Sequence, residues 1–364
     1  MDTTTGLRHD RLLTKNSAGT RRTAGRRIML TRNFAIAFGA AAVIAGGPVA
    51  AQDTFSMKVG IVVQNDPLHE SIKLLKERVE TRTNGRVKVE LFPGAQLGGI
   101  PQHVQGVLLG TIEVFATPPA FFKGTDPRFG VTDAPGLFDS IEHAHRTFTD
   151  PEFRETYLSV GVAKGVKGIS VWNYSPTSYA SLTPIRRLDD FKGKKIRVLA
   201  TPVELGIMKE LGAAGIPMDY AETLPALQNK TLDAQRSSIV VMGSSKHYTV
   251  TKFITVVQDT MIPCGAMVST AFLNKLPADL RQAVEQAGKD TEEPMLKIAI
   301  EFDAKAEQLW KDNGAEIIKL SDADKTEFMK RARAVGEQVL SGDPATKDLF
   351  EVFKRVAEKH RKKV

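Results

Sequence analysis

The chain has 364 residues, of which 42% are hydrophobic and 25% are charged, and its formal net charge is +8. This length allows two domains, and the composition excludes a collagen-like, coiled-coil or disordered chain. Residues 1–51 contain eight basic and two acidic side chains, so the remainder, with 42 basic and 40 acidic side chains, is close to neutral. A nearly neutral body is not expected to bind nucleic acid.

The first 51 residues have the organisation of an export signal. A basic stretch precedes an apolar run of about a dozen residues, which is followed by Pro48-Val-Ala-Ala51. The apolar run is shorter than the ~20 residues that a membrane-spanning helix needs. The sequence therefore predicts a signal peptide that is cleaved after Ala51 and a mature protein in the periplasm. Either Met1 or Met29 could be the start, and both the general secretory and the twin-arginine route stay open.

After residue 51, short β-rich runs alternate with segments of helical periodicity. This alternation predicts parallel strands joined by crossover helices, which is the pattern of an α/β fold. In the first half, we predict strands at 57–63, 87–92, 112–116 and 166–174, and helices at 69–81, 104–110 and 149–161.

A polar segment at 175–182 predicts a connection into a second unit of the same kind. Its expected strands are 195–199, 216–220, 234–241, 253–257 and 267–273, and its expected helices are 202–213, 222–229 and a long one at 278–310 that is kinked at Pro294. Two such units, joined by several crossings of the chain, predict a hinged two-domain protein with a binding cleft. The expected domain I comprises residues 52–174 and about 263–302, and domain II comprises about 175–262 and 303–364.

Sequence motifs of catalysis and of metal binding are absent. The chain has no P-loop, no dinucleotide-binding glycine motif after a strand, no G-x-S-x-G and no H-E-x-x-H. Cys264 is the single cysteine, which rules out an intramolecular disulfide and a cysteine-based metal site. His143 and His145 are two residues apart, a spacing that points them to different sides of a helix, so we expect them at the surface. We therefore predict no catalytic residue, no metal and no cofactor.

The segment 191–198 reads Phe-Lys-Gly-Lys-Lys-Ile-Arg-Val. It resembles the signature of the substrate-binding subunits of tripartite ATP-independent periplasmic (TRAP) transporters, the DctP-like family. Further segments resemble the motifs of this family in the same order, and together they cover roughly residues 55–345. They are Phe92-Pro-Gly-Ala-Gln-Leu-Gly98, Pro217-Met218 with Glu222-Thr-Leu-Pro-Ala-Leu-Gln228, Thr231-Leu-Asp-Ala-Gln235 and Leu276-Pro-Ala-Asp-Leu280.

The resemblance implies a two-domain α/β fold of the periplasmic-binding-protein kind, with hinge strands and a long helix that spans both domains. It also implies a solute-binding protein, and not an enzyme, that captures a small carboxylate anion in the interdomain cleft. The implied partners are the small and the large subunit of a membrane permease. No cofactor is implied.

The resemblance also implies site residues in the second domain. Arg197 matches the arginine that pairs with the ligand carboxylate, and a guanidinium offers a planar pair of donors that fits a carboxylate. Tyr220 falls where the family often has an aromatic residue against the ligand, and Ser237 falls where many members have asparagine. The chain departs from the family pattern at Arg236, where an acid is usual, which brings a second potential cation near the site.

In the first domain, we expect ligand contacts from residues that follow strands. Gln64 and Asn65 end the first strand, at the edge where α/β sheets present ligand-facing loops. Phe121 follows another strand, and Trp172 and Asn173 end the strand that enters the hinge. One fixed cation among several aromatic side chains suits a monocarboxylate with an apolar or aromatic body.

Two other functions stay open from the sequence. One is an extracytoplasmic ligand sensor, which would use the same fold without a permease. The other is a secreted enzyme that acts on a carboxylate, which predicts that residues such as Asp233, Arg236 and His247 converge in the cleft.

Overall fold

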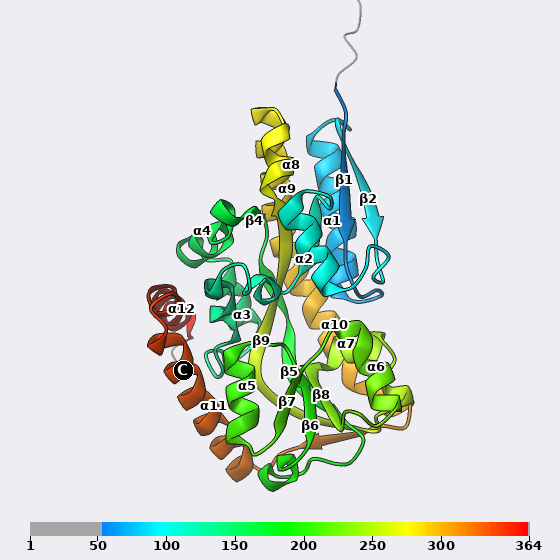
Figure 1. Cartoon of the computed structure of the whole chain (residues 1–364), viewed down its shortest axis with the longest axis vertical. Coiled ribbons are helices and arrows are strands. Elements are labelled where there is room, and N and C mark those ends of the chain that lie inside the picture. The colour runs from blue at the N-terminus through cyan, green and yellow to red at the C-terminus, as the bar shows by residue number, and fades with distance from the viewer. Residues whose placement is uncertain (1–52, 363–364) are drawn as a thin grey trace, which may run out of the picture. The chain divides into compact units, whose positions relative to one another are not determined.

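A mixed β-sheet runs through residues 53–362, the part of the chain that this computed structural model describes (Figure 1). The strand order is β2-β1-β3-β9-β5-β8-β6-β7, and β4 and β10 also pair with β9. The predicted signal peptide and its cleavage site lie outside the described residues. The strands are β1 (Phe55–Gly60), β2 (Val87–Phe92), β3 (Val114–Thr117), β4 (Val166–Gly168), β5 (Trp172–Ser181), β6 (Lys195–Val198), β7 (Ala214–Pro217), β8 (Ala234–Ser238), β9 (Phe253–Ser269) and β10 (Glu316–Lys319).

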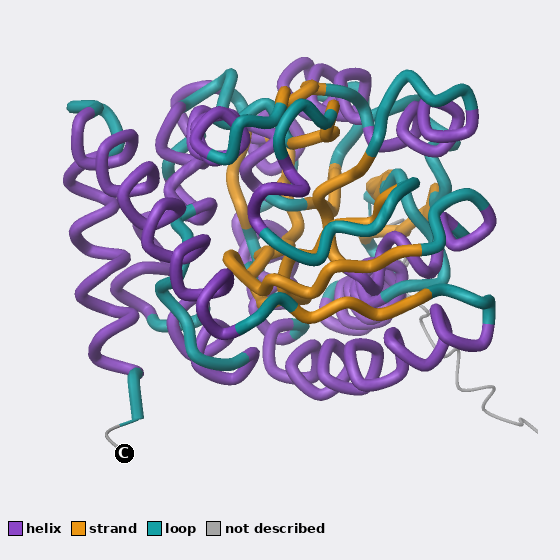
Figure 2. Tube along the Cα trace, turned by 90° about the horizontal axis from the view of Figure 1, so that it is seen from below, coloured by secondary structure: helices purple, strands orange, loops and turns teal. Residues whose placement is uncertain are grey.

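Helices surround the strands, which lie in the interior of the view in Figure 2. Short 3₁₀ turns η1 (Pro119–Phe122), η2 (Pro127–Asp133), η3 (Val162–Lys164), η4 (Leu188–Phe191) and η5 (His247–Thr249) complete the elements. The helices are α1 (Pro67–Arg82), α2 (Ile100–Leu109), α3 (Ile141–Phe148), α4 (Pro151–Ser159), α5 (Pro202–Glu210), α6 (Tyr220–Gln228), α7 (Ile239–Ser244), α8 (Thr270–Lys275), α9 (Ala278–Asp290), α10 (Glu292–Asp312), α11 (Asp322–Gly342) and α12 (Lys347–His360).

The two predicted β-α-β units are both present. In the first, β1 pairs in parallel with β2 and β3, and α1 connects β1 to β2. In the second, β6 pairs in parallel with β7 and β8, and α5 connects β6 to β7. Helix α1 forms because Leu68, Ile72, Leu75 and Val79 are buried at helical spacing, and it begins where Asp66 caps the free amide of His69.

Strands β5 and β9 join the two units. β9 is one strand of 17 residues, not the two strands predicted at 253–257 and 267–273. It pairs with β3 and β4 at its carboxyl end and with β5 and β10 over the rest. These two long antiparallel strands are the predicted hinge strands.

The predicted polar connection at 175–182 is wrong, because most of this segment belongs to β5, which is buried along its whole length. Two of its hydroxyl groups find carboxylate partners inside the protein. The Thr177 hydroxyl donates a hydrogen bond of 2.6 Å to Asp259 Oδ1, and the Ser175 hydroxyl donates one of 3.0 Å to Asp303 Oδ1. Buried polar side chains with partners are compatible with a central strand.

The long helix predicted at 278–310 is divided at Thr291 into α9 and α10. Proline lacks an amide hydrogen and its ring clashes with the carbonyl four residues earlier, here that of Asp290, so one straight helix cannot pass through Pro294. α10 packs against α1 and β5 and also against α7 and β10, and it is thus the predicted domain-spanning helix.

The predicted domain bounds stay a prediction, because the described residues form one compact unit. Within this unit, α11 packs against α5, and α12 packs against α3 and α4.

The backbone of β9 lies very close to the backbone just before β5, and this contact yields a first prediction. A Cβ atom added to Gly265 in β9 would lie 1.9 Å from the carbonyl oxygen of Ser170, which precedes β5. Because this neighbour is backbone, Gly265→Ala should lower the free energy of unfolding by about 2–3 kcal/mol, as overpacking of a core does. Urea unfolding monitored by circular dichroism measures the change.

The matched control is Gly124→Ala, since a Cβ atom at the exposed Gly124 would meet nothing within 4 Å. Equal stability of the two variants would contradict the close approach of these backbones.

Candidate functional site

A cavity lies at the carboxyl ends of the parallel strands of both units. This is the edge at which open α/β sheets bind their ligands. On one side the cavity is lined from the turn after β1 and from α1, α2, β3 and η1. On the other side it is lined from β6, α5, α6, β8 and α7, and β5 and β9 contribute between them. The lining residues are Val62, Val63, Asp66, Leu68, Ile100, Thr117, Pro118, Phe121, Tyr174, Arg197, Leu199, Glu204, Tyr220, Arg236, Ser237, Val241, Ile262 and Cys264.

Arg197 is buried in the wall of this cavity, with only 2% of its surface exposed. Its Nε donates a hydrogen bond of 3.0 Å to the carbonyl of Met218, and its guanidinium carbon lies 5.6 Å from the ring centre of Tyr220. Within residues 53–362, neither Nη atom donates a hydrogen bond and no carboxylate forms an ion pair with this side chain. Burial lowers the pKa of Arg197, but an arginine stays charged in a protein. The carboxylates of Glu204 and Asp219 act on it from farther away, so the site holds a buried cation without a direct ion-pair partner among the described residues.

Arg236 lines the same cavity, but two carboxylates neutralise its charge. Its Nη1 contacts Glu204 Oε1, and its Nη2 lies 2.7 Å from Asp259 Oδ2 and 3.0 Å from the hydroxyl of Thr260. Although burial opposes the charged form, the carboxylates of Asp259 and Glu204 raise the pKa of Arg236 well above its usual value. The charge of this second arginine, which the sequence predicts near the site, is thus already neutralised within the protein.

Asp66 contributes a carboxylate from the first unit. It follows β1 directly and is fully buried. Its Oδ1 accepts a hydrogen bond of 2.9 Å from the amide of His69, and its Oδ2 accepts one of 2.8 Å from the hydroxyl of Tyr174. Burial raises the pKa of Asp66 to about 6, so the group is still mainly a carboxylate at neutral pH.

Four of the residues predicted from the sequence line the cavity, namely Arg197, Tyr220, Ser237 and Phe121. Tyr220 begins α6, although the sequence placed it at the end of a strand, and its hydroxyl donates to the carbonyl of Val241 at 3.0 Å. Its ring is held in this way beside Arg197.

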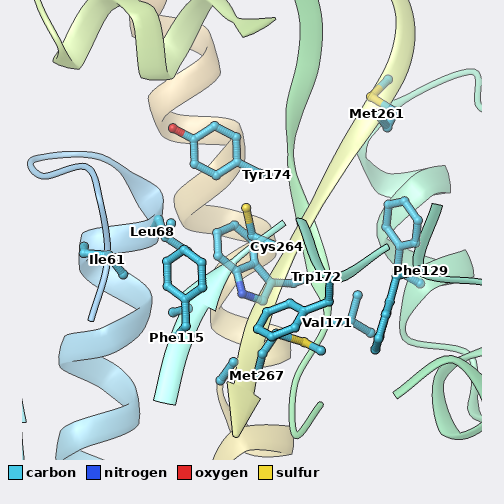
Figure 3. Close-up of a cluster of buried hydrophobic side chains, with 14 of the residues drawn as sticks. Ile61, Leu68, Phe115, Phe129, Val171, Trp172, Tyr174, Met261, Cys264 and Met267 are labelled. Carbon is cyan, nitrogen blue, oxygen red and sulfur yellow. The ribbon is translucent and has the colours of Figure 1, made fainter. Parts of the chain in front are cut away.

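The other four predicted residues do not line the cavity. Trp172 and Asn173 lie on β5 and are buried, and Trp172 packs in a cluster of apolar side chains with Phe115, Cys264 and Met267 (Figure 3). Gln64 and Asn65 are exposed in the turn after β1.

The sequence did not single out Asp66 or Glu204 as cavity residues, whereas Arg236, which it placed near the site, does line the cavity. A signal for Asp66 exists, since an aspartate before a proline marks a helix start directly after the first strand.

The structure also bears on the histidines. His143 and His145 are buried, so their expected surface position was wrong. His143 Nε2 is hydrogen-bonded to the carbonyl of Ala357 at 2.7 Å, which ties α3 to α12. In the described part of the chain, no group of three histidine, cysteine, aspartate or glutamate residues could hold a metal ion.

The cluster expected of an enzyme does not assemble. The Asp233 carboxylate accepts from the amide of Lys195 at 2.7 Å, and His247 is hydrogen-bonded to the hydroxyl of Thr223 at 3.1 Å. Arg236 has neither of them as a partner. In the part of the chain covered by residues 53–362, no helix combines the length and apolarity needed to cross a membrane.

Comparison with known proteins identifies relatives along most of the chain. Residues 59–343 match the sequence model of the family described as bacterial extracellular solute-binding protein, family 7. The 2,3-diketo-L-gulonate-binding periplasmic protein of Escherichia coli K12 is 30% identical over 277 residues, which are 76% of this chain and 83% of that protein. The C4-dicarboxylate-binding periplasmic protein of Rhodobacter capsulatus is 30% identical over 282 residues, which are 77% of this chain and 82% of that protein.

Solved structures show the same fold. The sugar acid binding protein of Advenella mimigardefordensis, in complex with galactonate, aligns with a TM-score of 0.79 and 25% identity over 85% of this chain and 99% of its own. A TRAP periplasmic solute-binding protein of Shewanella oneidensis with bound succinate aligns with a TM-score of 0.77 and 26% identity over 84% of this chain and 99% of its own. The predicted α/β fold of the periplasmic-binding-protein kind is confirmed, and so is the prediction of a solute-binding protein that is not an enzyme. The chain belongs to family 7 of the bacterial extracellular solute-binding proteins, the DctP family of TRAP transporters.

Proposed function

We propose that this chain binds a small organic-acid anion in the cavity around Arg197 and delivers it to the small and large subunits of a TRAP permease. It acts in the periplasm, after removal of the signal peptide predicted at residues 1–51. The names of its relatives support both points, since they are periplasmic proteins that bind a diketogulonate or a C4-dicarboxylate. The solved structures with galactonate and succinate support the organic-acid class.

The observation that carries this proposal is the buried, unpaired charge of Arg197. A cation removed from water is costly unless an anion pairs with it, and among the described residues no carboxylate lies within ion-pair distance of this guanidinium. The N–H groups on the two Nη atoms are available as donors, and a ligand carboxylate would accept two parallel hydrogen bonds from the guanidinium. Tyr220, Ser237 and Phe121 line the same space and would contact the body of the ligand.

The proposed binding couples to closure of two domains. The cavity is lined from both β-α-β units, and β5, β9 and α10 contact elements of both. With residues 52–174 and about 263–302 as one domain and about 175–262 and 303–364 as the other, bending at β5 and β9 would open the cavity. A ligand that contacts both sides stabilises the closed state by its differential affinity, and the permease would recognise that state.

Replacement of Arg197 tests the proposal directly. A thermal-shift screen of organic acids identifies a ligand, because a ligand that binds the folded state raises its melting temperature. Arg197→Met should then weaken binding of that acid by at least about 100-fold in titration calorimetry, as expected when one member of a buried charge pair is lost.

The matched control is Arg331→Met, which removes an arginine of α11 that pairs with Glu327 at 2.8 Å on the surface. This control should bind the acid as the unmodified protein does. Unchanged affinity in Arg197→Met, or the absence of any organic-acid ligand, would refute the proposed function.

Replacement of the two buried arginines should lower stability by different amounts in the absence of ligand. Arg236→Met leaves Glu204 and Asp259 buried without their cation, so we expect the free energy of unfolding to fall by about 3–5 kcal/mol. Arg197→Met removes a cation that has no carboxylate partner, so we expect a loss below about 1 kcal/mol. Urea unfolding of ligand-free protein measures both. Equal destabilisation by the two substitutions would mean that Arg197 is neutralised within the protein.

A further inference from the structure

The polar groups of the cavity wall are largely paired with one another. Arg236 is held by Glu204 and Asp259, and the second oxygen of Glu204 accepts a hydrogen bond of 2.7 Å from the amide of Leu199. The hydroxyl of Tyr174 donates to Asp66, and that of Tyr220 donates to the carbonyl of Val241. Among the charged groups of the described lining, Arg197 and Asp66 lack an ion-pair partner, and Arg197 is the one cation of the two.

Arg197 can pair with one carboxylate of a ligand, but the charges around the cavity disfavour a second one. Asp259 and Glu204 together already exceed the charge of Arg236, and Asp66 adds a carboxylate from the opposite unit. A second carboxylate on the ligand would find no free cation and would approach Asp66 or Glu204. Like charges brought together in a site of low polarity repel each other strongly, so such a ligand is disfavoured.

Apart from the hydroxyl groups of Thr117 and Ser237, the rest of the wall is apolar. Val62, Leu68, Ile100, Phe121, Val241 and Ile262 contribute hydrocarbon surface from both units. A hydroxylated ligand body would lose its hydrogen bonds to water against these side chains, and each unsatisfied group would weaken binding. An apolar ligand body gains from the same burial.

We infer that the ligand is a monocarboxylate with an apolar body, and that Asp66 is a specificity-determining residue that excludes a second carboxylate. This inference rests on the proposed function, and it names the class of acid within it. It separates this chain from relatives whose names state C4-dicarboxylate or diketogulonate binding.

A series of acids with a shared carbon skeleton tests the inference. Hexanoate, adipate and gluconate have the same six-carbon chain, and they differ in a second carboxylate or in hydroxyl groups. Phenylacetate and 4-carboxyphenylacetate form an aromatic pair. Titration calorimetry at about pH 8, where Asp66 is ionised, should give the apolar monoacids at least about tenfold tighter binding than adipate, gluconate or the aromatic diacid.

The residue itself is tested with Asp66→Asn, which is nearly isosteric and keeps an oxygen that can cap α1. The ratio of monoacid to diacid affinity should fall by about tenfold or more, because the repelling charge is gone. The matched control is Asp126→Asn, another capping aspartate whose Oδ1 accepts from the amide of Arg128 at 3.0 Å, away from the cavity lining. This control should leave the ratio unchanged, and circular dichroism checks that both variants fold.

The outcomes separate the two proposals. If adipate, gluconate or the aromatic diacid binds as tightly as the apolar monoacids, the inference fails while organic-acid binding stands. An unchanged ratio in Asp66→Asn removes the specificity role of Asp66. If no organic acid binds at all, both the inference and the proposed function fail.

Discussion

The structure depends on one asymmetry between two buried arginines. Arg236 and Arg197 line the same cavity, yet the first is enclosed by the carboxylates of Glu204 and Asp259, while the second meets only the carbonyl of Met218 and the ring of Tyr220. Because taking a guanidinium out of water is costly, a fold that buries one without a counter-ion is arranged for an anion that arrives from outside. Binding thus completes a charge pair of which the protein supplies one half.

Much of the fold could be predicted because its units are local. The β-α-β units follow from short β-rich runs, helical periodicity and turn residues within about 30 residues of each other. Arg197 could be found because it lies inside a short motif at residues 191–198. The strand β5 could not be recognised, since its serine and threonine residues are typical of a loop. The partners of Thr177 and Ser175, Asp259 and Asp303, come from distant parts of the chain. The hydrogen bonds that allow these polar residues to be buried exist only in the tertiary structure.

In the first unit, the sequence pointed to Gln64 and Asn65 as cavity residues, but the next residue, Asp66, is the one that lines the cavity. Gln64, Asn65 and Asp66 follow β1 in succession, and the sequence does not tell which of them enters the cavity. Asn65 adopts a positive φ of 60°, which reverses the chain locally, and Asp66 then takes the capping position of α1. The turn leaves Gln64 and Asn65 exposed and turns Asp66 inward, where Tyr174 donates to it. The backbone conformation of this turn, and not the type of its residues, thus decides which of the three side chains enters the cavity.

The effect of Arg236, which stands where the family usually has an acid, becomes clear only from its neighbours in the structure. An arginine in place of an acid suggests a more positive site, but the structure buries it together with two acids, Glu204 at the start of α5 and Asp259 on β9. Asp259 in turn accepts from Thr177 on β5, so the charged group is linked to both hinge strands. The cluster adds rigidity where the strands cross and adds no net positive charge to the cavity. The charge that the cavity accepts on a ligand therefore depends on which arginines and carboxylates of the wall are already paired. The number of arginines in the lining does not by itself predict it.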